Sequence, residues 1–215
     1  MNMFKDRKDA GQKLAKALTA YKGEEPLVLA IPRGGVVVGH QVAGHLKSDF
    51  SIIVVRKLPF PDNPEAGFGA IAEDGSTYFV ERALDILPSD TIEQIIEEQK
   101  LEINRRIDVL RKRRPLPAIK NRTVILVDDG IAMGSTVRAA IMLCKNNNAF
   151  KTIVAAPVAG PTTAADLAEI VDKVVILEKP SYFRAVAQVY ENWYDVPDEE
   201  VIQIMQEYER LIRCA

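Results

Sequence analysis

Two adjacent carboxylates and a loop of small and hydroxyl residues make the stretch VILVDDGIAMGST, at 124–136, the most informative part of the sequence. The apolar run before Asp128 and Asp129 predicts a buried strand, and the residues beyond them predict a turn into a helix. The glycines of the turn allow a ligand to approach the backbone closely, and Ser135 and Thr136 offer hydroxyl donors. A helix that begins there adds free N–H groups and the positive end of its dipole. The pattern therefore predicts a phosphate-binding turn beside an acidic pair.

The acidic pair needs a different partner, because two ionised carboxylates repel a phosphate. Carboxylate oxygens accept hydrogen bonds from hydroxyl groups and bind Mg²⁺ or its waters. Ribose hydroxyls or hydrated Mg²⁺ would therefore suit Asp128 and Asp129. The turn is not a nucleotide-binding P-loop, because no lysine stands before Ser135 or Thr136.

Two further predicted strands also end in groups that suit an anion. The first ends in the turn AIPRGG, and the second ends in VVRK, which carries a cationic pair. Ligands of open α/β sheets bind outside the carboxyl ends of the strands, so we expect these groups to meet the acidic pair on one rim. The residues concerned are Arg33, Gly34, Gly35, Arg56 and Lys57.

Five short runs predict the strands that position these groups. The runs are almost continuously apolar, which is typical of parallel strands covered on both faces. Amphipathic segments alternate with them, and Thr162 or Thr163 is a candidate N-cap for one of these helices. We therefore predict an α/β fold with an open, mainly parallel twisted sheet flanked by helices. The predicted strands are 27–31, 52–56, 124–128, 153–158 and 174–177.

One region does not fit simple strand–helix alternation. Residues 58–80 are rich in Pro and Gly and predict a long loop, with a hairpin around Asp74-Gly75. Residues 89–114 predict a long helix, capped near Ser89 and ended by the prolines that follow it. We expect a last helix after Asp198. The expected layout is one domain over 1–215, with a core of about 25–178, an insertion at 58–117 and a hood from 1–24 and 179–215.

Composition limits the class of protein. The chain has 215 residues, a formal net charge of −2 and only two cysteines, neither in a CxxC pair, so a metal motif and a disulfide framework are not expected. The N-terminus lacks an apolar signal core, and no run approaches the ~20 apolar residues of a membrane span. We expect a cytoplasmic protein without membrane contact. The acidic balance disfavours nucleic acid as a partner, although Arg105, Arg106 and 111–114 leave a local basic face open.

VILVDDGIAMGST resembles the phosphoribosyl pyrophosphate (PRPP) motif of type I phosphoribosyltransferases. AIPRGG is similar to the pyrophosphate loop of that family, and VVRK is similar to its cationic strand end. The resemblance covers about residues 25–178. The chain ends, with FKDRKDAG at the start, resemble an uncharacterised phosphoribosyltransferase-like subfamily.

The resemblance implies a role for each motif. Asp128 and Asp129 would hold the ribose hydroxyls, directly or through the waters of a Mg²⁺ cofactor, and with Lys57 they would be the catalytic residues. The AIPRGG loop would bind pyrophosphate, often through a strained or cis peptide, and residues 58–80 would close over the site as a mobile hood loop. The PRPP-binding residues would be Arg33, Gly34, Gly35, Arg56, Lys57, Asp128, Asp129, Gly130, Ala132, Met133, Gly134, Ser135 and Thr136.

The implied function is Mg²⁺-dependent transfer of the phosphoribosyl group of PRPP to a nitrogenous base or other nitrogen nucleophile, with release of pyrophosphate. Ala132 stands where 6-oxopurine enzymes typically carry an aspartate, which disfavours hypoxanthine and guanine as acceptors. Met133 replaces a common threonine and removes one hydroxyl donor to the phosphate. The sequence leaves open the acceptor and the oligomeric state, although a homodimer is common in this fold.

Two alternatives remain at this point. The first is a PRPP- or nucleotide-binding regulatory protein of the same fold without turnover, and the second is a phosphosugar hydrolase. Two further side chains have a structural and a functional interpretation. We expect Glu73 to be an exposed loop acid rather than a substrate contact, and Trp193 and its aromatic neighbours to pack in the core rather than stack on a base.

Overall fold

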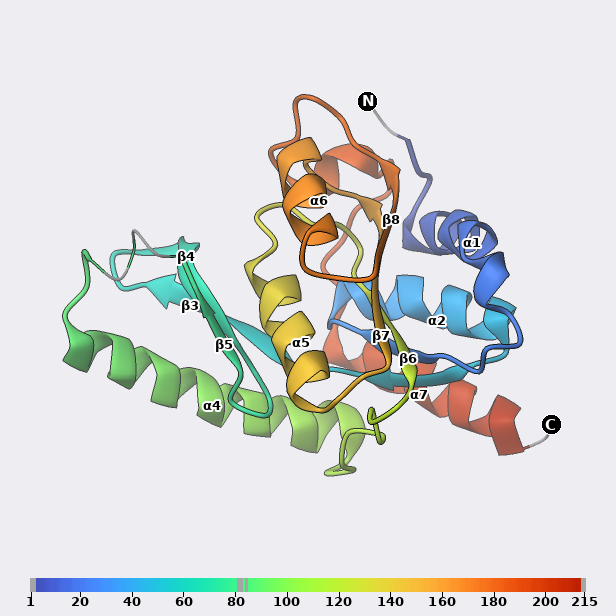
Figure 1. Ribbon diagram of the computed structural model, residues 1–215, viewed down its shortest axis with the longest axis horizontal. Helices are drawn as coiled ribbons and strands as arrows, with labels where there is room; N and C mark the ends of the chain where they lie inside the picture. The colour runs from blue at the N-terminus through green and yellow to red at the C-terminus, as the bar shows by residue number, and fades with distance from the viewer. Residues whose placement is uncertain (1–2, 81–82, 84, 214–215) are drawn as a thin grey trace.

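Five parallel strands form the central sheet of the computed structural model, which describes residues 3–80, 83 and 85–213 (Figure 1). The strand order is β2-β1-β6-β7-β8, and all four neighbouring pairs are parallel. The predicted open parallel sheet is confirmed. The strands are β1 (Leu27–Ala30), β2 (Asp49–Ile52), β6 (Thr123–Val127), β7 (Lys151–Val158) and β8 (Lys173–Glu178).

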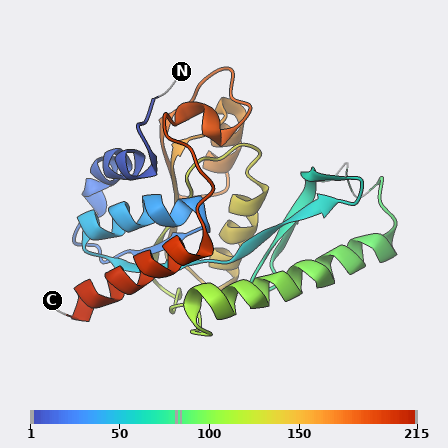
Figure 2. The same ribbon diagram turned by 180° about the vertical axis from the view of Figure 1, so that it is seen from behind.

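Alternate residues of these strands face two different groups of helices. Val28, Ile125 and Ile153 share a core with α1 (Arg7–Ala17), α2 (Gly34–Leu46) and α7 (Asp198–Arg213). Leu29, Leu126 and Val154 pack on the other face with α5 (Ser135–Asn146) and α6 (Pro161–Ala168). Figures 1 and 2 show these two helix layers on opposite sides of the sheet. Burial on both faces explains why the strands are apolar throughout.

A second, antiparallel sheet projects to one side of the central sheet (Figure 1). Its strands are β3 (Val55–Phe60), β4 (Asn63–Ala72) and β5 (Thr77–Phe79), in that order. The long helix α4 (Ser89–Arg111) covers one face, where Ile95 and Ile103 share a core with Phe68. Helix α5 covers the other face, where Ala70 and Ala72 share its core. We call β3, β4, β5 and α4 the arm.

The prediction of a long loop over residues 58–80 is therefore wrong, although the hairpin around Asp74-Gly75 is confirmed between β4 and β5. The prolines and glycines of this region suggested a loop, but they suit strands at their actual positions. Pro59 lies on an edge strand at a shift in the β3–β4 register, where a missing N–H donor is tolerated. A β-carbon at Gly69 would lie 2.2 Å from the carbonyl oxygen of Tyr78, so β4 and β5 need a glycine there.

Three other boundaries differ from the predictions. The apolar run at 52–56 is not one strand: β2 ends at Ile52, and the chain passes through Ile53 and Val54 into the arm. Helix α4 ends at Arg111, since the next two residues adopt positive φ values of 52° and 61°. Helix α6 begins at Pro161 after Gly160, so Thr162 and Thr163 lie inside its first turn and do not cap it.

The N-terminal segment meets the segment that precedes α7 in the chain. Phe4 and Tyr190 form an isolated parallel bridge, and the backbone N–H of Met3 donates to the carbonyl of Val189 at 3.0 Å. Helix α1 follows directly, with a side-chain cap from Asp6 to the N–H of Asp9. None of the helices in the described part of the chain is long and apolar enough to cross a membrane.

Candidate active site

The AIPRGG loop and the acidic pair lie at the carboxyl ends of β1 and β6, which are neighbours in the sheet. From β1 the chain crosses to β2 on one side, and from β6 it crosses to β7 on the other. This divergence is the switch point at which open α/β sheets bind ligands. The loop at 31–33 leaves β1 there, and the loop at 128–134 leaves β6 beside it.

The first loop lies directly against the acidic pair. A β-carbon at Gly34 would lie 1.8 Å from Asp129 Oδ2, and one at Gly35 would lie 3.1 Å from Asp128 Oδ1. Only glycine allows this approach, so the predicted contact between the two motifs has a steric reason. The peptide bond between Pro32 and Arg33 is cis.

Asp128 and Asp129 have different surroundings. Asp128 Oδ1 accepts the backbone N–H of Asp129 at 2.8 Å. Protein atoms crowd the Asp128 carboxyl group, and this desolvation, together with the charge of Asp129, raises the pKa of Asp128 well above its ordinary value. The pair therefore does not present two equivalent anions.

An arginine from helix α1 pairs with the second acid. Arg7 Nε donates to Asp129 Oδ2 at 2.7 Å, and only 4% of the Arg7 side chain is exposed. Its Nη1 donates to the carbonyl of Tyr194 at 2.8 Å, and its guanidinium carbon lies 3.9 Å from the ring centre of Trp193. Tyr190 donates its hydroxyl to the Asp129 carbonyl at 2.6 Å. Arg7 and the segment at 190–194 thus fix the position of Asp129.

Arg7 is a site residue that the sequence did not predict. It lies in the FKDRKDAG stretch, whose charged residues gave no chemical pattern. The expectation for the C-terminal aromatics is correct only in part. Tyr190 is buried with Phe4, but Trp193 is 39% exposed and covers the Arg7 guanidinium.

Asp128→Asn is expected to stabilise the fold at neutral pH. A carboxyl whose folded-state pKa is raised stabilises most below its unfolded pKa, and that stability is lost as pH rises through the folded value. The amide avoids this loss and keeps an oxygen for the Asp129 N–H. Denaturant unfolding should show a gain on the order of 1 kcal/mol at pH 7 and a smaller gain at pH 4. Equal gains at both pH values, or a loss at pH 7, would contradict the shift; exposed Asp90→Asn is the control.

The second loop forms a hollow at the start of helix α5. Gly134 adopts a positive φ of 79° just before Ser135 begins the helix, so the first helical N–H groups point into the turn. Thr163 Oγ1 donates to the carbonyl of Ala132 at 2.8 Å and ties this loop to α6. The hollow has a volume of about 250 Å³ and is lined by Lys57, Gly67, Gly130, Ile131, Ala132, Met133, Gly134, Ser135, Thr136 and Val186.

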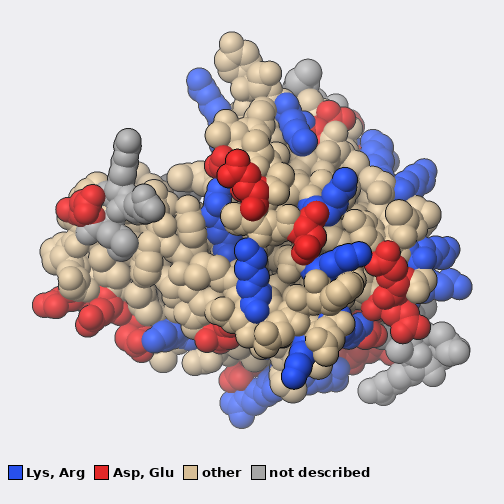
Figure 3. All heavy atoms as spheres, viewed as in Figure 1, with Lys and Arg blue, Asp and Glu red and all other residues tan. Residues whose placement is uncertain are grey.

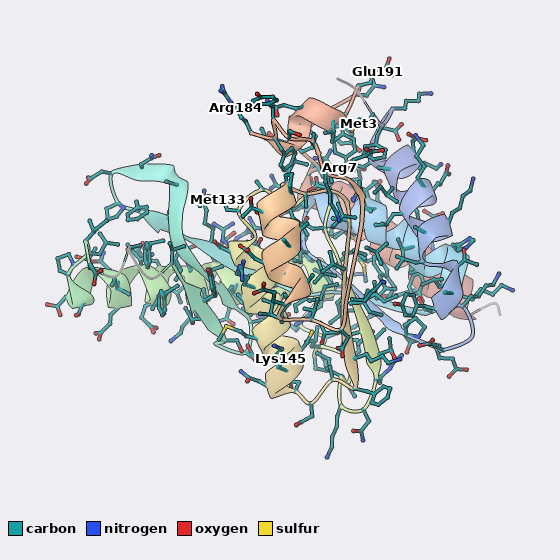
Figure 4. All side chains as sticks on the ribbon, turned by 45° about the horizontal axis from the view of Figure 1, so that its top comes forward. Met3, Arg7, Met133, Lys145, Arg184 and Glu191 are labelled. Carbon is teal, nitrogen blue, oxygen red and sulfur yellow. The ribbon has the colours of Figure 1, made fainter. Side chains whose placement is uncertain are left out.

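Figure 4 shows Met133 and Arg7 toward the same end of the molecule, while Lys145 marks the other end of α5. Met133 is 68% exposed, so the position that would carry a hydroxyl in the resembling family is open to solvent. The structure thus brings the predicted phosphate turn and Lys57 together, beside the acidic pair.

Arg56 and Lys57 do not act as one cationic pair. They are neighbours on β3, so their side chains leave opposite faces of the arm sheet. Lys57 lines the hollow at the α5 side, whereas Arg56 Nε donates to Gln99 Oε1 of α4 at 3.0 Å. Burial, and then the nearby Arg106, lower the pKa of Arg56. Lys57 therefore lines the hollow, whereas Arg56 lies on the α4 side of the arm sheet, where Arg33 is one of the charges that act on it.

Glu73 is not exposed and is not among the residues that line the hollow. It forms an ion pair with Arg111, and the two side chains are only 8% and 4% exposed. Its Oε1 also accepts the Val54 N–H at 2.9 Å, while Arg111 donates to the carbonyl of Ile52 at 3.0 Å. This pair joins the β4–β5 turn to the end of α4 and to the link between β2 and β3.

The basic stretch at the end of α4 is largely compensated. Arg111 is buried against Glu73, Arg113 pairs with Asp108 at 3.1 Å, and Arg114 pairs with Glu209 of α7. Acidic and basic side chains are interspersed over the face in Figure 3. Arg105 and Arg106 also pair, with Glu102, so five of the six arginines and lysines considered for a local basic face have an acidic partner.

The side chains present fit Mg²⁺ only as a partner reached through water. Among the described residues, no three His, Cys, Asp or Glu side chains gather closely enough to hold a metal ion. The raised pKa of Asp128 favours its neutral form, and Asp129 Oδ2 already accepts from Arg7. Most oxygens around such an ion would have to come from the ligand and water.

A glycine turn, an acidic pair and a second glycine turn at the start of a helix thus lie together at the switch point of the sheet. The profile of the phosphoribosyl transferase domain matches residues 2–192. The solved structure of TT1426 from Thermus thermophilus is 37% identical, covers 97% of this chain and 99% of that chain, and gives a TM-score of 0.81. The chain belongs to the phosphoribosyl transferase domain family.

Two curated Mycobacterium tuberculosis proteins are also similar. They are named "Putative phosphoribosyl transferase Rv0571c" (strain ATCC 25618 / H37Rv) and "Putative phosphoribosyl transferase MT0597" (strain CDC 1551 / Oshkosh). Each is 37% identical over 215 residues, which cover 98% of this chain. The chain spans about half of their length, 48%.

Proposed function

We propose that this chain is a phosphoribosyltransferase that moves the phosphoribosyl group of PRPP to a nitrogen nucleophile and releases pyrophosphate. The observation that carries the proposal is the direct packing of Gly34 and Gly35 on the acidic pair, beside a second turn that suits a phosphate. One site can then meet three parts of PRPP: the diphosphate, the ribose hydroxyls and the 5′-phosphate. We further propose that the whole chain acts as one domain, with the arm as an insertion.

Each group has a proposed task that follows from its surroundings. Asp129 accepts a ribose hydroxyl with the oxygen that Arg7 does not engage, and Asp128 adds a second acceptor or, when protonated, a donor. The backbone N–H groups at 134–136 bind the 5′-phosphate. The Arg33 loop binds the diphosphate, and Lys57 adds positive charge from the arm.

In this reaction the protein mainly positions the reacting groups and stabilises the charge that develops. The bond from the ribose to the diphosphate breaks, the sugar gains oxocarbenium character, and the nitrogen of the acceptor forms the new bond. Fixed donors around the departing diphosphate stabilise its developing charge, and exclusion of water protects the reactive sugar. Mg²⁺, when bound with PRPP, neutralises part of the diphosphate charge. The arm replaces the predicted mobile loop as the element that covers the hollow, since it carries Lys57 and Gly67.

The acid pair is expected to be essential for turnover. Asp128→Asn with Asp129→Asn should lower PRPP-dependent release of pyrophosphate at least 100-fold while circular dichroism stays native. The reason is that ribose loses its charged acceptor and Arg7 loses its counter-ion. A matched pair, Asp90→Asn with Asp108→Asn on exposed positions of α4, should keep full turnover.

The same assay separates the alternatives. Unchanged turnover in the acid-pair variant would refute the assignment. Saturable PRPP binding without pyrophosphate release across a panel of bases would instead identify a binding protein. Phosphate or sugar-phosphate release without an added base would identify a hydrolase.

A further inference from the structure

Four arginines from three parts of the chain converge on the α4 side of the candidate site. Arg33 comes from the loop after β1, Arg56 from β3, and Arg105 and Arg106 from the middle of α4. Arg106, Arg105 and Arg33 all lie close enough to Arg56 to lower its pKa. We call these four residues the arginine cluster. In Figure 2, the start of α7 approaches α4 in the region where β3 passes behind them.

Only two carboxylates pair with the arginine cluster in the described contacts. Glu102 accepts from Arg105 Nε at 2.7 Å and from Arg106 Nε at 2.9 Å, and these hydrogen bonds lower the pKa of Glu102 to about 2. Asp198, the first residue of α7, lies 3.6 Å from Arg33 and 3.8 Å from Arg105. The four guanidinium groups thus outnumber the carboxylates that pair with them by two.

The contacts of Asp198 are longer than hydrogen bonds. A charge-assisted N–H···O bond is about 2.7–2.9 Å long, so neither arginine makes one to Asp198 in this geometry. The side chains of Arg33 and Arg105 are 38% and 51% exposed, which leaves their donors open to a solute. The Asp198 carboxylate thus lies between two guanidinium groups and leaves their N–H donors available for other hydrogen bonds.

The surroundings of Arg56 give a further reason to expect an anion at the arginine cluster. Arg56 is half-buried, has the neutral Gln99 as its hydrogen-bond partner, and faces three other arginines. Holding a desolvated cation among cations costs free energy, which a bound anion would offset. Planar guanidinium groups also bind phosphate oxygens in pairs.

We propose that the arginine cluster is a binding site for two linked phosphate groups, with Asp198 occupying part of the site when it is free. The site begins at Arg33, in the proposed diphosphate loop, and continues onto α4 of the arm. Binding of linked phosphates by the arginine cluster does not depend on the proposed function; only the assignment of these phosphates to PRPP does. The linked phosphates belong either to PRPP itself or to a separate diphosphate ligand.

The test is calorimetric titration of the whole chain with inorganic pyrophosphate. Arg105→Gln with Arg106→Gln should weaken binding at least tenfold. Lys100→Gln with Arg113→Gln makes the same charge change on α4 and its end, away from the cluster, and should stay within twofold of the native protein. Asp198→Asn should tighten binding about threefold or more, because it removes a competing carboxylate and keeps every arginine.

Two results would overturn the proposal: native affinity in the Arg105/Arg106 variant, or weaker binding in Asp198→Asn. The opposite directions expected for the two variants exclude a general structural effect. Competition between PRPP and pyrophosphate would assign the site to the diphosphate of PRPP, and simultaneous binding would assign it to a separate ligand. If pyrophosphate binding depends on Arg105 and Arg106 but PRPP does not bind, the cluster stands and the proposed function falls. If PRPP binds but pyrophosphate binding is independent of these arginines, the proposed function stands and the cluster falls.

Discussion

Gly34→Ala is expected to weaken PRPP binding at least 100-fold in a calorimetric titration. The new methyl group would lie 1.8 Å from Asp129 Oδ2 and 2.8 Å from Arg7 Nε, so the loop and the acid cannot keep their positions. Either the Arg7–Asp129 pair opens or the first loop moves away from the ribose site. Both outcomes separate the groups that would meet the diphosphate and the ribose, and small displacements of binding groups are costly.

Gly44→Ala is the matched control, because it makes the same change in the same helix. A β-carbon at Gly44 has no neighbour within 4 Å, so PRPP affinity should stay within twofold of the native value. The free energy of unfolding should rise by about 0.5–1 kcal/mol, since alanine favours a helix over glycine. Native PRPP affinity in Gly34→Ala would show that the two loops do not bind one ligand together.

Glu73→Gln is expected to lower the free energy of unfolding by about 3–5 kcal/mol. The substitution leaves the Arg111 guanidinium, 4% exposed, without its counter-charge and turns an amide toward one of its donors. It also disturbs the site that accepts the Val54 N–H, where the chain enters the arm. Chemical denaturation at neutral pH measures the change directly.

Glu97→Gln serves as the control for that measurement. Glu97 pairs with Lys100 on the surface of α4, with 68% of its side chain exposed, so its loss should change stability by less than about 0.5 kcal/mol. Similar losses of unfolding free energy in the two variants would mean that the buried Glu73–Arg111 pair contributes no more to stability than an exposed pair. A selective loss in Glu73→Gln would identify the pair as the joint that holds the arm.

The motifs at the switch point could be predicted because their information is local. An apolar run followed by two acids and a glycine turn specifies a buried strand, a strand end and a helix start within 13 residues, 124–136. Neighbouring strands bring such ends together whatever the surrounding loops do. The contact of Gly34 and Gly35 with the acid pair therefore follows from the parallel pairing of β1 and β6.

The role of Arg7 could not be predicted, because its partners are remote in sequence. Asp129 lies 122 residues away and Tyr194 lies 187 residues away. Nothing in the local charge pattern of α1 distinguishes Arg7 from the exposed lysines nearby. The ring of Trp193 over its guanidinium is likewise a tertiary contact.

The arm was missed for a different physical reason. Proline and glycine are common in loops, but Pro59 occupies an edge position and Gly69 a close approach between strands. The apolar run at 52–56 also hides a break, since β2 and β3 belong to different sheets. Because of this break, Arg56 and Lys57 are neighbours on β3, and their side chains point to opposite faces of the arm sheet. Arg56 therefore contacts α4, and Lys57 lines the hollow.

The most direct test of the central claim is a calorimetric titration of the native chain with PRPP, with and without Mg²⁺, and with ribose 5-phosphate for comparison. We predict saturable PRPP binding that Mg²⁺ strengthens and that exceeds ribose 5-phosphate affinity at least tenfold, because in the proposed site the Arg33 loop would bind only the diphosphate, which ribose 5-phosphate lacks. Absence of PRPP binding under both conditions, or equal affinity for ribose 5-phosphate, would contradict the proposed phosphoribosyltransferase site.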